Sequence, residues 1–343
     1  MDALSTPVIL LLFVASGALI WWAGEILAAS TDAIDAHFGW GQGLGGAVFL
    51  AVATNLPEFA IIVGGALRND LALAVGNILG GIAIQTVVLV LLDGPGLRTK
   101  VPLTFVVTSL TIVLEGLVLI VILMFCILGA LMPPQLIFLR TTPAEIAILV
   151  TWLVGLFLVQ RNEDAKAWRI AREEIAERDP ILHAKSRPFG QVMLFFAVAA
   201  IATLGAGLVL ALTSDVAANR FHFSGVVFGA TILAAVTALP EVTTGLYAVK
   251  AGNYELAMSD IIGGNAFLPV LFIFGTLISN KALLPDAQGP DLYITALGAL
   301  LTAVYCIGVT ARSKRMVLGA GFDSLLVLVL YVIGIVGLFF VKA

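Results

Sequence analysis

Two distant segments of the chain carry the same oxygen-bearing side chains around a proline. Leu56-Pro57-Glu58 in the first half matches Leu239-Pro240-Glu241 in the second, and a threonine precedes each glutamate by four residues, at Thr54 and Thr237. In a helix, residues four apart lie on one face, so each hydroxyl is expected beside its carboxylate. Hard oxygen ligands without His or Cys suit Ca²⁺, Na⁺ or Mg²⁺ and not zinc or copper. The pattern therefore predicts a site for hard cations.

The two prolines add backbone oxygens to this pattern. Proline has no N–H, and its ring clashes with the carbonyl four residues before it in a helix. For Pro57 that carbonyl belongs to Ala53, and for Pro240 it belongs to Val236. Both carbonyls must find other partners, so Ala53 and Val236 are candidate cation ligands through their main-chain oxygens.

A further pair of polar residues follows each motif. The offset between the two glutamates, 241 − 58 = 183 residues, also aligns Asn77 with Asp260, and Gly80-Gly81 with Gly263-Gly264. Paired small residues allow helices to approach closely in a membrane bundle. Asp260 is therefore a candidate charged ligand, and Asn77 is a candidate neutral one.

The composition of the chain identifies the elements that must carry these residues. Of 343 residues, 60% are hydrophobic and 12% are charged, whereas soluble proteins carry about 25% charged residues. The mean hydropathy is +1.08. A bilayer core about 30 Å thick requires ~20 apolar residues per spanning helix, and the long continuous runs here differ from the short alternating segments of a β-barrel. These features exclude a soluble enzyme and predict an all-α polytopic membrane protein.

About ten apolar runs are candidate transmembrane helices. They lie near 5–28, 42–67, 71–92, 102–128, 143–160, 189–213, 223–249, 254–278, 291–311 and 319–341. Residues 161–188 differ sharply, because they mix charges of both signs densely. Such a segment is typical of a solvated linker, and it separates the first five apolar runs from the last five.

The two sets of five helices are predicted to be repeats of one unit. The same offset pairs Ala23-Gly24 with Ala206-Gly207, and apolar composition alone does not explain shared Pro, Glu and paired Gly in register. We therefore expect a first repeat at 1–160, the linker at 161–188 and a second repeat at 189–343. An odd number of helices per unit inverts the second unit, and inverted repeats in secondary transporters form their sites near the membrane midplane.

Basic residues predict how the chain is oriented. Five of the 18 Lys and Arg residues lie on one side, namely Arg68, Arg140, Arg220, Lys281 and Lys342, so the remaining 18 − 5 = 13 lie on the side of 161–188. Basic residues concentrate on the cytoplasmic side. We expect 161–188 in the cytoplasm, both termini outside, and a plasma-membrane protein. The first apolar run lacks a basic preceding region and is expected to be a retained helix.

Glu58, Glu241 and Asp260 fall within predicted spanning helices, whereas no Lys or Arg falls in the middle of one. A charge at the centre of a membrane helix costs ~2.5–3.5 kcal/mol on insertion scales, so such residues are functional candidates. With no basic residue in these helices to neutralise the acids, the expected countercharge is a bound cation or a proton.

These segments resemble the signature repeats of the calcium/cation antiporter superfamily. Ala-Thr-Asn-Leu-Pro-Glu followed by Ala-Val-Gly-Asn-Ile-Leu-Gly-Gly resembles the first, and Thr-Ala-Leu-Pro-Glu followed by Met-Ser-Asp-Ile-Ile-Gly-Gly-Asn resembles the second. The Leu-Pro-Glu form is closer to sodium/calcium exchangers than to proton-coupled cation exchangers. The resemblance implies ten helices as two inverted repeats over essentially the whole chain. It also implies a cation site formed by Glu58, Asn77, Glu241 and Asp260, with Thr54 and Thr237 as hydroxyl and carbonyl ligands.

The chain departs from the superfamily pattern where hydroxyls are usual. Asn55 and Ala238 replace the serine before Leu-Pro-Glu, and Gly-Ser-Asn becomes Gly80-Gly81-Ile82 and Gly263-Gly264-Asn265. Fewer hydroxyl ligands weaken the expectation of sodium coupling. Coupling to protons, through protonation of a buried Glu or Asp, gains weight accordingly.

The expected function is secondary active antiport of Ca²⁺ against Na⁺ or H⁺ by alternating access. The alternative is a Na⁺/H⁺ or other monovalent cation/proton antiporter without calcium transport, and a passive channel would differ by needing no counter-ion.

The sequence has no P-loop, so an ion gradient and not ATP is expected to drive transport. Neither a nucleophile with a base nor a Gly-x-Gly-Asp pair is present, so the chain is not expected to be an enzyme. We expect inorganic cations and the lipid bilayer as partners, with no cofactor and no nucleotide. The net charge of −4 is too small to suggest a nucleic-acid partner.

A few other polar residues remain open to two interpretations. Glu115, inside the fourth helix, is either a proton relay or a packed, protonated carboxyl. Asn55 either lines the site or makes an interhelical hydrogen bond. Cys126 and Cys306 lie in apolar runs and are interpreted as buried small hydrophobic residues.

Overall fold

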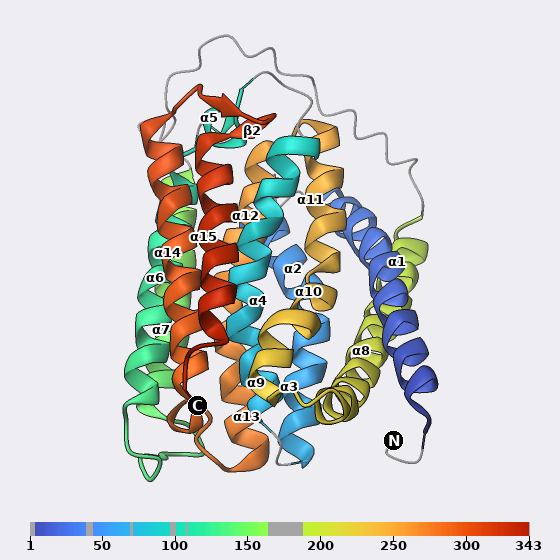
Figure 1. Cartoon of the computed structure of the whole chain (residues 1–343). Coiled ribbons are helices and arrows are strands. Elements are labelled where there is room, and N and C mark those ends of the chain that lie inside the picture. Colours follow the sequence, from blue (N-terminus) through green and yellow to red (C-terminus); the bar gives the residue numbers. More distant parts are fainter. Residues whose placement is uncertain are drawn as a thin grey trace.

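The computed structural model describes residues 4–38, 44–68, 71–96, 101–107, 109–163 and 188–342. Most of the predicted linker 161–188 lies outside the described residues, so the linker stays a prediction. The described chain is a bundle of helices with one short β-hairpin at one end (Figure 1).

The elements of the first half are helices. They are α1 Thr6–Phe38, α2 Leu44–Thr54, α3 Leu56–Arg68, α4 Ala72–Leu91, the π-helical turn η1 Leu92–Gly96, α5 Leu103–Val106, α6 Thr111–Ala130 and α7 Pro143–Glu163.

The second half repeats this pattern and adds the hairpin. Its elements are α8 Phe189–Arg220, α9 Gly225–Phe228, the π-helical turn η3 Gly229–Leu233, α10 Ala234–Thr237, α11 Leu239–Ala251, α12 Tyr254–Phe267, the 3₁₀ turn η4 Leu268–Leu271, α13 Phe272–Ser279, the 3₁₀ turn η5 Leu284–Asp286, α14 Gly289–Ala311, β1 Met316–Val317, β2 Ala320–Gly321 and α15 Phe322–Leu338. The two strands pair antiparallel.

Within the described residues, eight helical stretches are long and apolar enough to cross a membrane. Two of them are assembled from shorter pieces: Gly225–Ala251 contains α9 to α11, and Tyr254–Ser279 contains α12 and α13. The interrupted pair α2–α3 and the 17-residue helix Phe322–Leu338 account for the other two predicted runs. The predicted all-α polytopic fold of about ten helices is confirmed.

Several predicted boundaries were too short, for a physical reason. The predicted run 189–213 stops just before Ser214 and Asp215, but α8 continues to Arg220. Thr213 Oγ1 donates to Val209 O at 2.8 Å, and the Asp215 carboxylate forms an ion pair with Arg68 at 3.2 Å. Polar side chains that bond back to their own helix or pair with a neighbouring helix, as Thr213 and Asp215 do, do not end a helix. Likewise α1 extends to Phe38, ten residues past the predicted end at 28.

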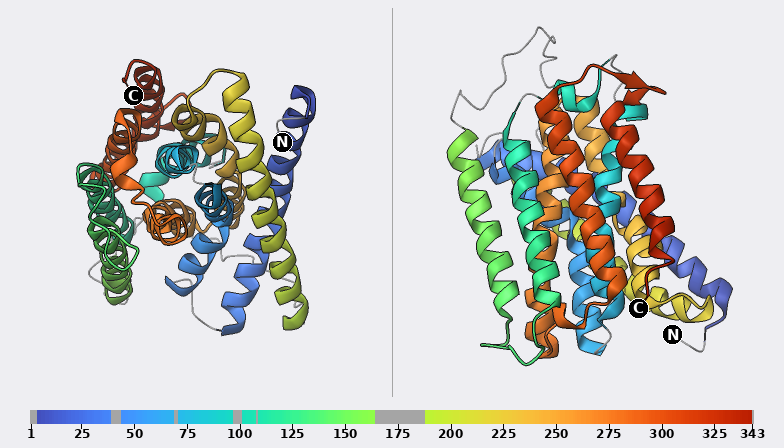
Figure 2. Two further views of the ribbon diagram at one scale, coloured as in Figure 1. Left: turned by 90° about the horizontal axis from the view of Figure 1, so that it is seen from below. Right: turned by 60° about the vertical axis from the view of Figure 1, so that its left-hand side comes forward.

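The helices surround α4, the most deeply placed span. In the view from below, α4 lies inside the ring formed by the others (Figure 2), and 83% of its most apolar window is buried in the protein. The long helices α1 and α8, which open the two halves, lie side by side on one flank (Figures 1 and 2). Exposed leucine, valine and phenylalanine side chains cover the outer faces of α1, α6, α7, α8 and α15, as expected for helices that face lipid.

Candidate cation site

Single residues interrupt two helices at equivalent places in the two repeats. Asn55 separates α2 from α3, Ala238 separates α10 from α11, and the proline of each motif follows two residues later. Helical hydrogen bonds persist before each interruption, from Asn55 N to Ala51 O at 3.3 Å and from Ala238 N to Ala234 O at 3.0 Å. They resume after it, from Phe59 N to Asn55 O at 3.1 Å and from Val242 N to Ala238 O at 3.2 Å. The missing N–H of each proline is therefore the local defect.

The carbonyls that the prolines leave without a helical donor lie directly before these interruptions. Ala53 is the next-to-last residue of α2, and Val236 is the next-to-last residue of α10. Ala53 is buried. The structure thus places both predicted backbone oxygens in the turn that precedes its own Leu-Pro-Glu motif.

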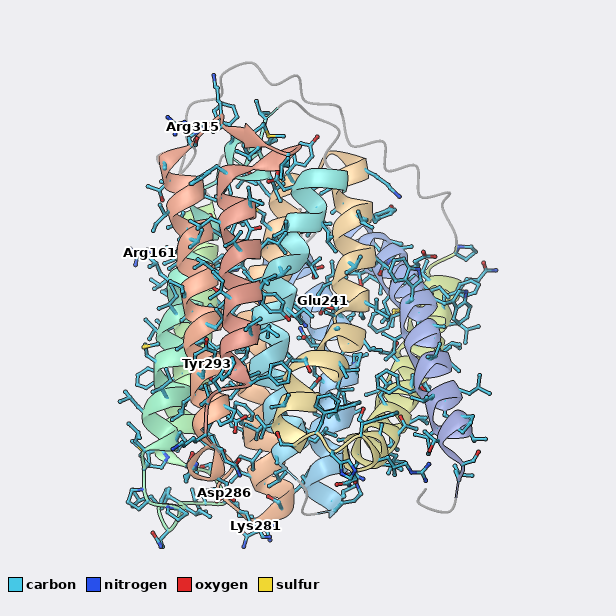
Figure 3. All side chains as sticks on the ribbon, viewed as in Figure 1. Arg161, Glu241, Lys281, Asp286, Tyr293 and Arg315 are labelled. Atoms are coloured by element: carbon cyan, nitrogen blue, oxygen red, sulfur yellow. The ribbon has the colours of Figure 1, made fainter. Side chains whose placement is uncertain are left out.

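Glu58 and Glu241 are buried close together where the two interruptions meet. Their exposed fractions are 0% and 1%, and Glu241 lies within electrostatic range of both Glu58 and Asp260. Figure 3 shows Glu241 near the middle of the length of the bundle. In the described part of the chain, neither Glu58 nor Glu241 forms an ion pair with a basic side chain. The two carboxylates therefore share one buried environment without a basic neighbour to neutralise them.

The two threonines reach across the repeats. The Thr54 hydroxyl faces Glu241, and the Thr237 hydroxyl faces Glu58. Thr237 Oγ1 also donates a hydrogen bond to Asn77 Oδ1 at 3.3 Å. Helical spacing within one segment predicted the threonine beside its own glutamate, so the structure corrects the partner: each threonine faces the glutamate of the other repeat. The reason is that each interrupted segment turns its motif toward the centre of the bundle, where the two motifs oppose each other.

Asp260 lies at the edge of this group. Its Oδ2 accepts a hydrogen bond from Thr244 Oγ1 at 2.5 Å, and its side chain is 2% exposed. Among the described residues, no three or more Asp, Glu, His or Cys side chains converge tightly enough to hold one ion. Glu58 and Glu241 therefore form the pair at the centre of the group, and Asp260 adds negative charge beside it.

Gln85 is a member of this group that sequence reasoning missed. It is fully buried on α4, and its Nε2 donates to Glu58 Oε1 at 3.4 Å. The search for repeats passed over it because the residue at the equivalent position of the second repeat is Leu268. The available signal was a second amide, after Asn77, inside the apolar run of α4. Thr244, which binds Asp260, was missed for the same reason, since its equivalent is Ile61.

Asn55 bonds to the preceding turn of its own segment in place of the predicted interhelical hydrogen bond, and its Oδ1 lacks a donor in the described structure. Its Nδ2 donates to Ala51 O at 2.6 Å, within its own helix. The side chain also lies against α12, because a Cβ added to Gly264 would approach Asn55 Nδ2 at 3.3 Å. Asn55 therefore satisfies the end of α2 and fills the space beside a glycine.

Glu115 extends from α6 to α12. Its Oε1 accepts a hydrogen bond from Ser259 Oγ at 2.7 Å, and its carboxyl group approaches Gly263. Glu115 thus joins α6 to α12 through Ser259, the residue directly before Asp260 in the chain.

The buried group is rich in oxygen atoms that lack a hydrogen-bond donor. In the described structure, Glu58 Oε2, both carboxylate oxygens of Glu241, Gln85 Oε1 and Asn55 Oδ1 are buried without a hydrogen-bond partner. Buried polar atoms are nearly always paired, and a cluster of unpaired buried oxygens is a recognised feature of sites that bind a ligand. Carboxylate and amide oxygens are the ligands that hard cations prefer, so the donor set fits such an ion.

Close helix packing holds Asn77 beside this group. A Cβ on Gly229 of η3 would lie 3.0 Å from Asn77 N, and a Cβ on Gly80 would overlap the backbone of Ala230. The glycines allow α4 and η3 to touch main chain to main chain. This contact fixes the depth at which Asn77 meets Thr237.

Comparison with known proteins decides the family. The model of the family described as "Sodium/calcium exchanger protein" matches residues 8–160 and again residues 190–340, which together make up most of the chain. The chain belongs to the sodium/calcium exchanger family. Members of this family are transporters and not enzymes, so this exchanger-family chain is an integral, multi-pass membrane protein that belongs to a family of cation antiporters.

Two relatives resemble this exchanger-family chain in sequence over most of its length. The inner membrane protein YrbG of Escherichia coli (strain K12) is 28% identical over 301 residues, which cover 84% of this chain and 85% of YrbG. The putative antiporter CaxA of Alkalimonas amylolytica is 27% identical over 308 residues, covering 87% of this chain and 90% of CaxA.

Solved structures share the fold of the exchanger-family chain. An H⁺/Ca²⁺ exchanger, CAX, superimposes with a TM-score of 0.69 at 14% identity, covering 98% of this chain and 82% of CAX. The sodium-calcium exchanger NCX_Mj superimposes with a TM-score of 0.62 at 17% identity, covering 97% of this chain and 99% of NCX_Mj. At these identities the likeness concerns the fold alone.

Proposed function

We propose that the chain exchanges Ca²⁺ against Na⁺ or H⁺ by alternating access, at a site centred on Glu58 and Glu241. The observation that carries this proposal is the pair of buried glutamates, one from each repeat, each faced by the threonine of the other repeat and neither joined to a basic side chain. Two negative charges and several amide and hydroxyl oxygens suit a divalent hard cation.

The same group of residues explains how transport would be coupled. A Ca²⁺ ion between Glu58 and Glu241 neutralises both carboxylates. Sodium ions on the same oxygens, or protons on the carboxylates, neutralise them equally well. The carboxylates must be neutralised at membrane depth. After Ca²⁺ leaves on one side, the protein therefore changes conformation again only when Na⁺ or H⁺ has taken its place. This makes the exchange obligatory.

In this proposal the remaining predicted ligands differ in the kind of group that they supply. Thr54, Thr237 and Asn77 supply neutral oxygens, Ala53 and Val236 supply carbonyls at the two interruptions, and Asp260 supplies charge. Repeats at 1–160 and 189–343, joined by the linker 161–188, are supported by the two separate matches of the family model.

Calcium flux driven by one ion gradient at a time tests the proposed function. Proteoliposomes containing the purified chain are loaded with ⁴⁵Ca²⁺, and efflux is recorded under an imposed sodium gradient, an imposed pH gradient, or neither. We expect efflux under at least one of the gradients and none without a counter-ion. Sodium or proton movement without any calcium movement would instead identify a monovalent cation antiporter, and calcium efflux without a counter-ion would identify a channel.

Removing the amide next to Glu58 is expected to weaken calcium binding. Gln85→Leu keeps the side-chain volume but deletes the hydrogen bond to Glu58 and one uncommitted oxygen. Hydrogen bonds to charged groups contribute ~1.5–3 kcal/mol, and the 3.4 Å bond is long, so we expect the calcium concentration for half-maximal exchange to rise about tenfold. Thr86→Val is the control, because the hydroxyl of Thr86 donates to Ile82 O and accepts from Asn265 Nδ2, and it forms no hydrogen bond with Glu58 in the described structure. If both variants changed the calcium concentration for half-maximal exchange equally, Gln85 would not be part of the site.

We also propose that the chain lies in the plasma membrane with both termini outside and residues 161–188 in the cytoplasm. The N-terminus and the C-terminus lie at one end of the bundle, and α7 ends and α8 begins at the other (Figure 1). This arrangement agrees with ten crossings and with the excess of basic residues on the side of 161–188.

Two matched surface cysteines test this orientation. Leu139 and Leu318 are exposed leucines with positive φ, 80% and 94% exposed, at opposite ends of the bundle. The native Cys126 and Cys306 are buried and give little background. In right-side-out vesicles, a membrane-impermeant maleimide is expected to label Leu139→Cys directly and Leu318→Cys only after permeabilisation. The reverse pattern would invert the proposed topology.

A further inference from the structure

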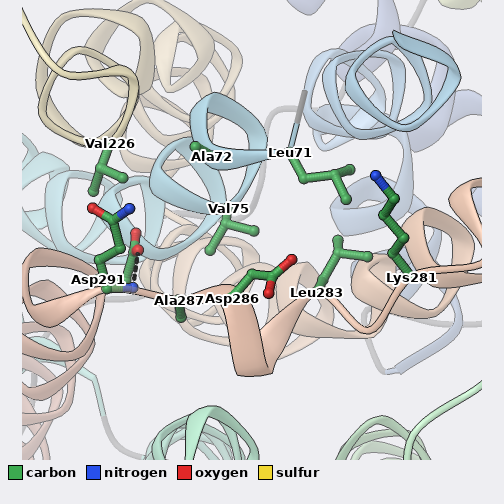
Figure 4. A pocket seen from close by; sticks show the side chains of 10 residues that line it. Leu71, Ala72, Val75, Val226, Lys281, Leu283, Asp286, Ala287 and Asp291 are labelled. Atoms are coloured by element: carbon green, nitrogen blue, oxygen red, sulfur yellow. Dashed lines mark hydrogen bonds between the residues drawn. The ribbon is translucent and has the colours of Figure 1, made fainter. Parts of the chain in front are cut away.

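A pocket opens at the end of the bundle that carries both termini, away from the paired glutamates. Its volume is about 400 Å³. It lies between the beginning of α4, the beginning of α9, the loop that contains η5 and the beginning of α14 (Figure 4). The residues lining it are Leu71, Ala72, Val75, Val226, Lys281, Leu283, Asp286, Ala287, Gln288 and Asp291. We call this space the outer pocket.

Asp291 is the deeply buried acid of the outer pocket. Its side chain is only 2% exposed. Its Oδ2 accepts a hydrogen bond from Gln288 N at 2.8 Å, which caps the beginning of α14. Its Oδ1 has no hydrogen-bond partner in the described structure. Capping explains one oxygen of this carboxylate, but it leaves the other buried and unpaired, which is costly unless a ligand meets it.

The remaining charges of the outer pocket are arranged along its length. Figure 4 shows Asp291 at one end, Asp286 between, and Lys281 at the other end. Asp286 and Lys281 are both exposed, and they form no ion pair with each other in the described structure. The ammonium therefore does not neutralise either carboxylate by contact, and the pocket keeps a net charge of −1.

The size of the outer pocket indicates the form in which a cation would enter it. A water molecule occupies ~30 Å³ of liquid volume, so the pocket has room for an ion together with several of its waters. Oxygen-seeking divalent ions such as Ca²⁺ accept carboxylates, amide oxygens and waters together. A site with two carboxylates and a nearby ammonium suits weak binding of such an ion.

We propose that the outer pocket binds a partly hydrated divalent cation, through Asp291 at depth and Asp286 near the surface. This site is separate from the one centred on Glu58 and Glu241. Its dissociation constant is expected on the order of 10⁻⁴ to 10⁻³ M, the range of weak calcium sites on extracellular modules. The pocket adjoins the glycine-packed contact of α4 with α9, where a Cβ on Gly76 would meet Val226 O at 2.7 Å.

Manganese binding to the full-length chain tests the outer pocket. Mn²⁺ is a hard, oxygen-seeking ion, and its free concentration can be measured by electron paramagnetic resonance. The titration uses the protein in nanodiscs with Glu58→Gln and Glu241→Gln in place. This background removes both glutamates whether or not they bind calcium, so the result does not depend on the proposed function. We expect one weak Mn²⁺ site to remain.

Three substitutions then assign that site. Asp291→Asn keeps an oxygen to accept the capping hydrogen bond but removes the charge, and it is expected to weaken Mn²⁺ binding at least about tenfold. Asp286→Asn is expected to weaken binding about threefold, and Lys281→Gln to strengthen it about threefold, because it removes a like charge. Glu255→Gln, at the opposite end of the bundle, is the matched loss of a carboxylate and is expected to leave binding unchanged.

Several results would overturn the proposal. One is the absence of Mn²⁺ binding in the background up to about 10 mM, ten times the weakest affinity expected. Another is a weak site that persists unchanged in both Asp291→Asn and Asp286→Asn. Because Asp286 and Lys281 lie at the surface, their substitutions decide the question even if Asp291→Asn fails to fold. Opposite shifts of the Mn²⁺ dissociation constant in Asp286→Asn and Lys281→Gln support the site. Dissociation constants equal to that of the background protein contradict it.

Discussion

Replacing either Glu58 or Glu241 by glutamine is expected to reduce calcium exchange in proteoliposomes at least about a hundredfold. Each substitution removes one of the two buried charges that face each other across the repeats. Two unit charges 4 Å apart interact by about 4 kcal/mol at an effective dielectric of 20, and a divalent ion loses at least one such contact. Remaining hydroxyl and amide oxygens do not replace a full charge. The measurement is the initial rate of ⁴⁵Ca²⁺ movement under a fixed counter-ion gradient.

The fold is expected to survive this change, so that the loss reports on the site. Glutamine has nearly the same shape as glutamate, and neutralising one of two buried like charges relieves repulsion. The thermal midpoint of unfolding should therefore stay constant or rise. Glu25→Gln, an exposed carboxylate on α1, is the control and should exchange calcium at the wild-type rate. Wild-type exchange in Glu58→Gln and Glu241→Gln would refute the proposed site.

The second large effect is expected from one of two adjacent glycines. Gly80→Ala places a Cβ onto the Cα and carbonyl oxygen of Ala230, whereas Gly81→Ala meets only Leu268 Cδ1 at 3.8 Å, an ordinary contact. Backbone atoms cannot rotate away as a side chain does. Overpacking typically costs 1–3 kcal/mol, and we expect about 3 kcal/mol or more for Gly80→Ala because α4 and η3 must separate.

The separation should also disturb function, since it moves Asn77 away from Thr237. Gly80→Ala is expected to lower the thermal midpoint and to reduce calcium exchange, while Gly81→Ala leaves both near wild type. Thermal unfolding in detergent and ⁴⁵Ca²⁺ exchange measure the two effects on the same preparations. If the two alanine variants proved equally stable, the close contact between α4 and η3 would be wrong.

The features that sequence could predict are those that depend on composition and repetition. Apolar run length predicted the spanning helices, and the duplicated Leu-Pro-Glu motif identified Glu58 and Glu241. A proline inside each apolar run predicted that the carbonyls of Ala53 and Val236 lose their helical donors, but not that the helices are interrupted at Asn55 and Ala238. The structure brings both glutamates together, as an inverted repeat requires. Each of these inferences rests on the chemistry of one segment or on the sequence alignment of the two repeats.

The features that sequence could not predict depend on packing between segments. Thr54 faces Glu241 because the two interrupted helices oppose each other, a relation that spacing along one helix does not contain. Gln85 donates to Glu58 from a different helix and has no polar equivalent in the second repeat. The π-helical turn η3, at Gly229–Leu233, packs closely against α4. Nor did the sequence separate the buried Asp291 from an ordinary acid at the start of a helix.

Exchange of calcium for calcium, without any other gradient, tests the central claim most directly. Proteoliposomes with equal sodium and pH on both sides are filled with unlabelled Ca²⁺ or left without it, and entry of external ⁴⁵Ca²⁺ is followed. The proposed alternating site predicts tracer entry that requires internal Ca²⁺ and that disappears in Glu58→Gln. Tracer entry that ignores internal Ca²⁺, or that persists in Glu58→Gln, would contradict a calcium antiporter built on this pair of glutamates.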